Sequence, residues 1–219
     1  MERVPEPELM LDEAQARAYA EADFDAPHSR CIELLRERCA LPAQGHALDL
    51  GCGPGDITLR VARALPSWCI DGLDGSPAML ALASAAAARA GLASRVRFHC
   101  AVLSAGDPPR NTYDLIVSNS LLHHLADPGV LWSAISRWGA AGSSVFVMDL
   151  LRPASDADAR ALVQHYAASE PDVLRHDFYH SLSAAYRPGE VRGQLAAAHL
   201  ERFALEVVSD RHWIVWGRL

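Results

Sequence analysis

A glycine-rich segment, Leu48-Asp-Leu-Gly-Cys-Gly-Pro-Gly-Asp56, follows a short apolar run and is well suited to binding a ligand. Its three alternating glycines let the chain turn sharply and let a ligand approach the backbone itself, which is more than a plain strand-to-helix turn requires. The free N–H groups of the helix that follows point into the same space. The spacing is Gly-x-Gly-x-Gly, narrower than in dinucleotide-binding loops. Asp49 and Asp56 on either side suit a cationic or amino-bearing ligand better than a pyrophosphate.

A second acidic position lies one predicted strand later, in Ile70-Asp-Gly-Leu-Asp-Gly-Ser-Pro-Ala-Met-Leu80. A carboxylate at the end of the second strand of a nucleotide-binding sheet can accept hydrogen bonds from both hydroxyls of a ribose. Asp74 is at the end of this strand, 19 residues after Gly55, whereas Asp71 is inside it. We therefore predict that Asp74 binds a ribose; the alternative is a helix-capping or surface aspartate.

Such residues need a scaffold in which the ends of neighbouring strands meet. Apolar runs predict strands at 47–50, 68–73, 96–100, 113–118 and 143–150, and helical patterns predict helices at 11–22, 28–39, 56–65, 77–90 and 128–138. This alternation, with strands apolar on both faces, favours a parallel sheet covered by helices on both sides. Residues 203–208 and 212–216, joined by a Ser209-Asp210 turn, are typical of an antiparallel pair.

The chain of 219 residues is long enough for one α/β domain and short for two, so a single domain over 1–219 is expected. Residues 1–10 are acidic and contain prolines, which favours a loose tail within an N-terminal segment of residues 1–27. Residues 153–188 are too many for an ordinary connection and predict a helical cap over a site.

Charge and cysteine usage restrict the possible partners and compartments. The net charge of −7 argues against a nucleic-acid backbone as partner. Five cysteines without a Cys-x-x-Cys motif indicate neither disulfides nor a metal site. The N-terminus lacks the features of a signal peptide and no apolar stretch could span a bilayer, so a cytoplasmic protein without membrane contact is expected. The oligomeric state does not follow from the sequence.

The ordered motifs resemble those of the class I S-adenosylmethionine-dependent methyltransferases, which have a Rossmann-like fold. The resemblance rests on Leu48–Gly55, on Asp74–Leu80 and on Tyr113-Asp-Leu-Ile-Val-Ser-Asn-Ser-Leu-Leu-His-His-Leu125, and it covers residues 28–150 well. It implies a doubly wound sheet of seven strands whose last strand is antiparallel. It also implies that S-adenosylmethionine is the cofactor and that Tyr19, Phe24 and His28 belong to a flap that closes over it.

The resemblance further implies a set of cofactor contacts. The methionine part would lie on the glycine loop, the ribose on Asp74 and the adenine near Met79. The predicted cofactor-binding residues are Asp49, Gly51, Cys52, Gly53, Gly55, Asp74, Gly75, Met79, Val102 and Asn119. In one respect the sequence departs from the family, because Val102 occupies the position where an acidic residue often faces the adenine amino group. Backbone groups or neighbours such as Cys100 and Ala101 would then hold the adenine.

The sulfonium already activates its methyl group, so a general base matters only for an acceptor that is protonated at working pH. We predict His124 as a base or acceptor-orienting group because histidine titrates in the useful range; a purely packing histidine is an equal alternative. Asp149 and Tyr179 are the other predicted catalytic residues, although Asp149 could simply hold Arg152. Further candidates beyond the ends of the strands are Ser120, His123, His165, Tyr166, His180 and Tyr186.

The methyl acceptor does not follow from the sequence. Asn119-Ser-Leu-Leu replaces the Asn/Asp-Pro-Pro-aromatic stretch of enzymes that methylate base amines, and the Pro-Cys nucleophile of cytosine C5 enzymes is absent. Together with the acidic charge, this favours a small-molecule acceptor with an oxygen, nitrogen or sulfur nucleophile. A protein or peptide side chain, or a cofactor-binding regulator without catalysis, remains an alternative. A nicotinamide-dependent oxidoreductase would need the wider glycine spacing.

Overall fold

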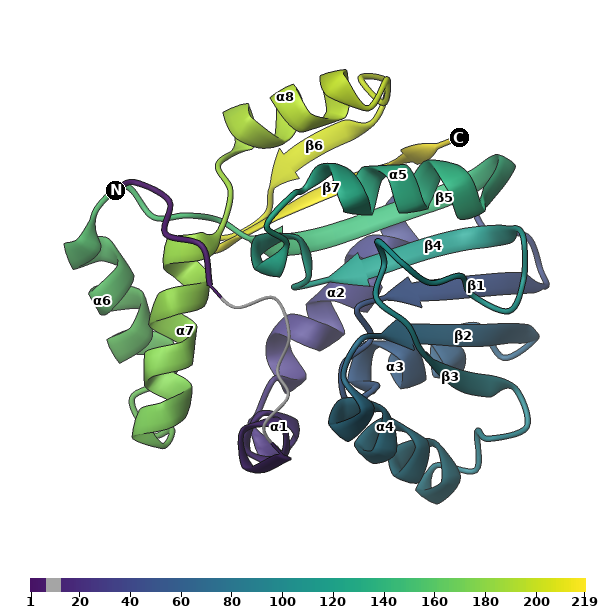
Figure 1. Ribbon diagram of the computed structural model, residues 1–219, viewed down its shortest axis with the longest axis horizontal. Coiled ribbons are helices and arrows are strands. Elements are labelled where there is room, and N and C mark those ends of the chain that lie inside the picture. Colours follow the sequence, from purple (N-terminus) through teal and green to yellow (C-terminus); the bar gives the residue numbers. More distant parts are fainter. Residues whose placement is uncertain (7–12) are drawn as a thin grey trace.

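A mixed β-sheet runs through the centre of the molecule (Figure 1). The computed structural model describes residues 1–6 and 13–219, and within them seven strands pair in the order β3-β2-β1-β4-β5-β7-β6. The strands are β1 (Gly45–Leu50), β2 (Trp68–Asp74), β3 (Val96–Cys100), β4 (Tyr113–Asn119), β5 (Gly139–Leu150), β6 (Ala204–Val207) and β7 (His212–Arg218). Strands β1 to β5 are parallel to one another, whereas β7 is antiparallel to both β5 and β6. The predicted seven-stranded Rossmann-like sheet with an antiparallel last strand is confirmed.

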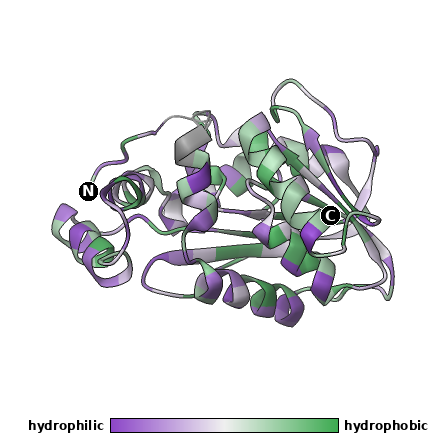
Figure 2. Ribbon diagram, turned by 90° about the horizontal axis from the view of Figure 1, so that it is seen from below, coloured by the Kyte–Doolittle hydropathy of each residue, from purple (hydrophilic) through white to green (hydrophobic). Residues whose placement is uncertain are grey.

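Successive side chains of a strand point to opposite faces of the sheet, and in these strands both faces are apolar. Helices therefore cover the sheet on both sides. In β4, Leu115 and Val117 face one hydrophobic core, while Ile116 faces the other. The first core is closed by α2 (Asp25–Arg38) and α3 (Asp56–Ala64), with α4 (Pro77–Arg89) beside them. The second is closed by α5 (Gly129–Trp138) and α8 (Pro188–Ala197). Seen from below, helices lie on either side of the strands (Figure 2).

The segment predicted as a cap contains two helices, α6 (Asp156–Tyr166) and α7 (Asp172–Ala184), which pack on each other beyond the ends of the strands (Figure 1). The start of α6 is fixed by a capping box in which Ser155 and Asp158 satisfy each other's backbone N–H groups. A short helix, α1 (Glu13–Glu21), contacts both α4 and α7. It lies within the helix predicted over 11–22, of which residues 11 and 12 are outside the described part.

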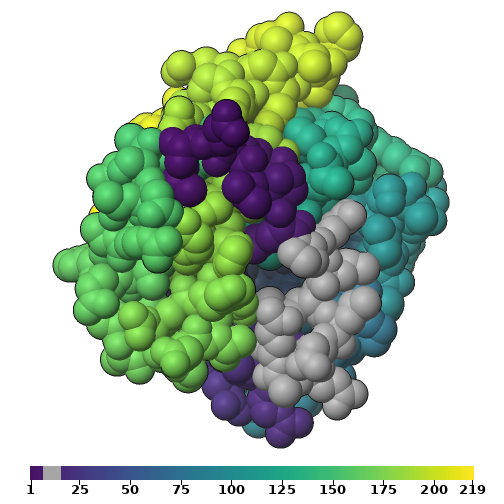
Figure 3. All heavy atoms as spheres, turned by 60° about the vertical axis from the view of Figure 1, so that its left-hand side comes forward, coloured from purple at the N-terminus to yellow at the C-terminus, as the bar shows by residue number. Residues whose placement is uncertain are grey.

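The N-terminal residues are not the loose tail that the sequence suggested. Residues 1–6 lie across the cap and the neighbouring end of the sheet (Figure 3). Val4 N–H donates to the carbonyl of Ser183 over 3.0 Å, and Arg3 donates to the carbonyls of Ala184 and His123. The Arg3 guanidinium also stacks on the ring of Tyr186, 4.1 Å from its centroid. Backbone carbonyls and one aromatic face therefore bind a segment whose composition alone favours disorder. Residues 7–10 of the predicted tail lie outside the described residues.

None of the helices in the described ranges is both long and apolar enough to cross a membrane.

Candidate functional site

A cavity of about 960 Å³ lies beyond the carboxyl ends of β1 and β4. The order of the sheet reverses between these two strands, since the chain runs outward from β1 to β3 and then returns to β4. In open α/β sheets this reversal leaves a crevice, because the connections on either side leave in opposite directions. The loops that line it follow β1, β2 and β4, with α1 and the cap helix α7 on the far side. Its volume suits a nucleoside cofactor together with a small acceptor.

The glycine loop forms the floor of this cavity. Gly51 and Cys52 donate their N–H groups to the carbonyl of Leu73 over 2.8 and 3.1 Å, which fixes the loop to the end of β2. Gly51 and Gly53 have φ values of +69° and +51°, in the left-handed region that favours glycine. Among the described residues, no atom would lie within 4 Å of a Cβ at Gly53. The loop therefore offers bare backbone to a ligand, as its sequence predicted.

Asp74 stands beside the loop, at the end of β2. Its Oδ2 accepts from Gly53 N–H over 2.9 Å and its Oδ1 accepts from Ser76 N–H over 2.8 Å. Burial raises the pKa of this carboxyl, against the lowering effect of the backbone N–H groups. Each carboxylate oxygen keeps a further lone pair that can accept from a hydroxyl. The geometry fits the predicted ribose contact.

Nine of the ten predicted cofactor residues line the cavity: Asp49, Gly51, Cys52, Gly53, Asp74, Gly75, Met79, Val102 and Asn119. Gly55 does not. Its φ of +87° opens α3, and a Cβ there would come within 3.0 Å of both Ala83 and Phe98. Gly55 is therefore needed for close packing of the loop against α4 and β3 rather than for a ligand. Ala101 lines the cavity, whereas Cys100 is exposed and outside its wall.

Asp49 is a carboxyl group enclosed in the base of the same cavity. Its side chain is almost fully buried, and Thr58 Oγ1 donates to its Oδ2 over 2.6 Å. Burial raises the pKa of Asp49 to about 7, although the Thr58 hydroxyl opposes the rise. Asp49 thus changes charge near neutral pH at the place where the resemblance puts the amino end of the cofactor.

We expect S-adenosylhomocysteine, which carries this amino group as an ammonium, to bind about tenfold more tightly at pH 8 than at pH 6. The sign follows from the raised pKa: the ammonium favours ionised Asp49, so binding below pH 7 must first release a proton. Calorimetry at the two pH values measures the effect. Asp49→Asn should abolish the pH dependence and Thr58→Val should move it to higher pH. Equal affinities at both pH values in the unaltered chain would contradict the assignment.

The residues predicted as a flap also line the cavity. The rings of Tyr19 and Phe24 lie 4.9 Å apart, and Phe24 stacks on His28 at 5.3 Å. His28 Nδ1 is 2.6 Å from Asp56 Oδ2, and Arg60 binds the same carboxylate. These hydrogen bonds tie the start of α2 to the start of α3, so the aromatic wall is held against the glycine loop.

On the opposite side of the cavity, after β4, two buried side chains form a pair. His123 Nδ1 is 2.5 Å from Asp149 Oδ1, and both side chains are 2% exposed. Asp149 also accepts from the N–H groups of Leu122 and Leu150. Burial alone would lower the pKa of His123, but the Asp149 carboxylate outweighs this effect and raises it. The backbone is strained just before the pair, where Ser120 has a φ of +54°.

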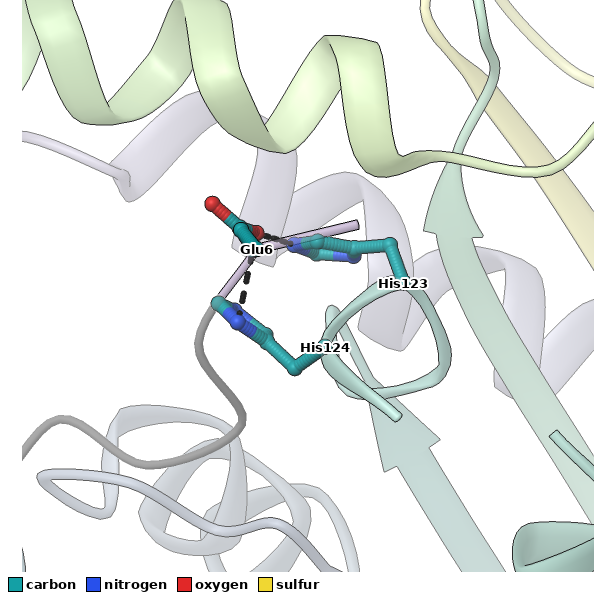
Figure 4. Close-up of side chains that lie close together, drawn as sticks. All are labelled: Glu6, His123 and His124. Carbon is teal, nitrogen blue, oxygen red and sulfur yellow. Dashed lines mark ion pairs between the residues drawn. The ribbon is translucent and has the colours of Figure 1, made fainter. Parts of the chain in front are cut away.

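Glu6 of the N-terminal segment lies against this pair. Its Oε1 is 3.5 Å from His123 Nε2 and 3.2 Å from His124 Nδ1, and the two imidazoles approach it from the same loop (Figure 4). Ser181 of α7 donates to the Glu6 carboxylate over 3.0 Å. Burial raises the pKa of Glu6. The nearby His123 is the largest effect that lowers it. Nothing in the sequence around Glu6 pointed to this position.

The structure places the predicted catalytic residues differently from what the sequence suggested. His124 lines the cavity, but the histidine paired with Asp149 is its neighbour His123. Asp149 does not hold Arg152, which instead donates to Glu190 of α8 over 2.8 Å. Tyr179 is outside the cavity wall, because its hydroxyl donates to Asp156 of α6.

Of the other polar candidates, some line the cavity and others lie outside it. Ser120, Tyr166 and His180 line the cavity. Tyr186 packs beneath Arg3, and His165 lies in a separate surface hollow beside α6.

Comparison with known proteins gives a family for the part of the chain that forms much of this cavity. The pattern of a family described as a methyltransferase domain matches residues 47–142, which contain the glycine loop, Asp74 and the two histidines. The chain is 35% identical over 190 residues to a trans-aconitate 2-methyltransferase of Streptomyces avermitilis. The alignment covers 83% of this chain, and the chain spans 65% of the length of that relative.

Solved structures share the fold at low identity. A SAM-dependent methyltransferase from Aquifex aeolicus has a TM-score of 0.70 and 16% identity, with 94% of this chain and 98% of that chain covered. The [4+2]-cyclase SpnF has a TM-score of 0.59 and 22% identity, covering 99% and 88%. Residues 47–142 match a methyltransferase domain, and the chain shares its fold with solved SAM-dependent methyltransferases. These similarities support S-adenosylmethionine as the cofactor, as the resemblance implied.

Proposed function

We propose that this chain transfers the methyl group of S-adenosylmethionine to a carboxylate oxygen of a small organic acid. The observation that carries the proposal is the continuity of one cavity, which joins the glycine loop and Asp74 to a chamber under the cap. A bound cofactor and an acceptor can therefore meet away from bulk water. A carboxylate is already deprotonated at neutral pH, so its oxygen attacks the methyl carbon and the electron pair of the S–C bond returns to sulfur.

The cap side of the cavity carries groups that suit an anion. Arg211, in the turn before β7, lines the cavity with its side chain 15% exposed. Its guanidinium stacks on the ring of Tyr166 at 3.3 Å and pairs with Asp210 Oδ1 at 3.3 Å, and both contacts hold the charge in place. His176 and His180 of α7 line the same side. The relative from Streptomyces avermitilis, named for trans-aconitate, supports an acceptor with several carboxylates.

An acceptor hydroxyl is the second candidate. Its proton must leave during transfer, and the buried pair of His123 and Asp149 is the observation that favours it. Asp149 holds Nδ1, so Nε2 is the atom that faces Glu6 and the cavity. The small-molecule acceptor is common to both candidates, and neither requires a nucleic acid.

The purified chain should form S-adenosylhomocysteine and a methyl ester when it is supplied with S-adenosylmethionine and trans-aconitate or another polycarboxylic acid. Arg211→Ala should raise the KM for the acid roughly tenfold, because it removes a charged partner of a carboxylate. Arg202→Ala is the matched control, since Arg202 also stacks on a ring, that of Phe203, but outside the cavity. Methylation of peptides in an extract, with no turnover on any small acid, would refute the proposal.

A further inference from the structure

Three side chains able to bind a metal converge on one point of the cavity wall. They are Glu6 from the N-terminal segment and His123 and His124 from the loop after β4, and their donor atoms all lie within 4.8 Å of one another (Figure 4). We propose that they form a binding site for a divalent transition-metal ion, with Zn²⁺ as the representative ion. Two imidazoles and one carboxylate make up a donor set that proteins use for catalytic zinc and for non-haem iron.

The two separations between Glu6 and the imidazoles fit such an ion. Ligand bonds to zinc measure about 2.0–2.1 Å, so two ligands of a tetrahedral site lie about 3.3 Å apart. Glu6 Oε1 is 3.2 Å from His124 Nδ1 and 3.5 Å from His123 Nε2. A charge-assisted hydrogen bond between the same groups would be shorter, about 2.7–2.9 Å. A shared ion therefore accounts for the spacing better than a direct ion pair does.

Neighbouring side chains orient two of the three donors toward the place of the metal. Nδ1 of His123 is hydrogen-bonded to Asp149 Oδ1 at 2.5 Å, which fixes the orientation of the ring. Nε2 is therefore the nitrogen that can bind a metal. Metal-binding histidines are commonly held by a carboxylate in this way. Ser181 donates to the Glu6 carboxylate over 3.0 Å and orients it toward the two rings.

The local charge also favours a cation. Glu6 and Asp149 place two carboxylates around the two imidazoles, and the side chain of Glu6 is only 11% exposed. The Arg3 guanidinium lies beside His123, but it donates to the carbonyls of Ala184 and His123 rather than to a carboxylate. A divalent ion would balance the two negative charges in a place largely shielded from water.

An ion bound here would keep one position open toward the cavity, because three protein ligands leave a tetrahedral site incomplete. All three donors line the cavity that also contains the glycine loop. That open position would accept an oxygen atom of the methyl acceptor, hold it in place and withdraw charge from it. This role rests on the proposed function, whereas binding of the ion does not.

The test uses the full chain without an affinity tag and stripped with a chelator. An exposed pair on α7, His176 and His180, has Nε2 atoms 3.0 Å apart and would bind metals on its own. The background is therefore the double variant His176→Ala/His180→Ala. Zn²⁺ is titrated by calorimetry, and Co²⁺ is titrated while the visible absorption of a four-coordinate site is recorded. Binding of S-adenosylhomocysteine is measured on the same samples to check the fold.

We expect the background to bind one Zn²⁺ per chain. Asp149→Asn should weaken binding about 10- to 100-fold, as loss of a carboxylate behind a metal-bound histidine does elsewhere. Glu6→Gln and His124→Ala, which remove direct ligands, should weaken it at least as much and abolish the Co²⁺ absorption. The proposal is overturned if the background binds S-adenosylhomocysteine but no Zn²⁺, or if both ligand variants bind Zn²⁺ as tightly as the background. Zn²⁺ binding to the background, together with failure of the unaltered chain to bind the nucleoside, would support the metal site while refuting the proposed function.

Discussion

Replacing Asp74 with alanine is expected to weaken the binding of S-adenosylhomocysteine by at least about 100-fold. Two hydrogen bonds from ribose hydroxyls to a half-buried carboxylate would be lost, and each such bond to a charged group contributes about 1.5–3 kcal/mol. The variant also removes the hydrogen bond that Gly53 N–H donates to Asp74 Oδ2, which shapes the glycine loop. Both losses act on the same ligand. Calorimetry with the demethylated cofactor measures the sum.

Asp127→Ala is the matched control for this variant. Asp127 Oδ1 accepts from the N–H of Gly129, two residues ahead, over 2.8 Å, just as Asp74 Oδ1 accepts from Ser76. Asp127 is exposed and outside the cavity, so its loss removes the same kind of turn without touching a ligand. The control should bind the nucleoside within about threefold of the unaltered chain. Similar affinities for Asp74→Ala and Asp127→Ala would show that Asp74 does not contact the ribose.

Much of the fold could be predicted because its signals are local in the sequence. Strand β3 (Val96–Cys100) has the predicted bounds, and β7 pairs with β6 across the predicted turn. Helix α8 was not predicted. Pro188 at its first position and Glu190 in its first turn are signals for a helix start, but Gly189 and Gly193 mask the helical pattern. Packing of Val191 and Leu195 on the sheet stabilises the helix despite both glycines.

The two halves of the cavity differed in how well the sequence revealed them. The glycine loop and Asp74 are recognisable because each follows its own strand within a few residues. The group around His123 is assembled by the fold: Asp149 comes from the end of β5 and Glu6 from a segment whose composition favours disorder. Proximity in sequence suggested that Asp149 holds Arg152, yet Arg152 lies beyond the strand and reaches α8. Metal-site rules based on cysteine spacing do not detect two adjacent histidines and a distant glutamate.

The second large effect is expected at His123. His123→Asn should lower kcat at least about 100-fold while leaving the affinity for S-adenosylhomocysteine nearly unchanged. An asparagine amide can still donate to Asp149 from the position of Nδ1, so the buried carboxylate keeps a partner and the fold is preserved. The atom that is lost is Nε2, which faces Glu6 and the acceptor side of the cavity. Initial rates of S-adenosylhomocysteine formation, with calorimetry on the same variant, separate turnover from cofactor binding.

His212→Asn provides the comparison, because His212 is a second histidine that is 8% exposed and lines the same cavity. Burial lowers the pKa of His212 to about 4, so it stays neutral at working pH, and its Nδ1 is 3.1 Å from Ser209 Oγ. His212 has no carboxylate partner of the kind that His123 has, and it does not lie beside Glu6. Its replacement should therefore change kcat by no more than about threefold. Equal losses of kcat in the two variants would mean that an asparagine at either position disturbs the cavity, whatever the role of the histidine it replaces. Only a selective loss at His123 is consistent with its Nε2 acting on the acceptor, either directly or by holding an ion beside it.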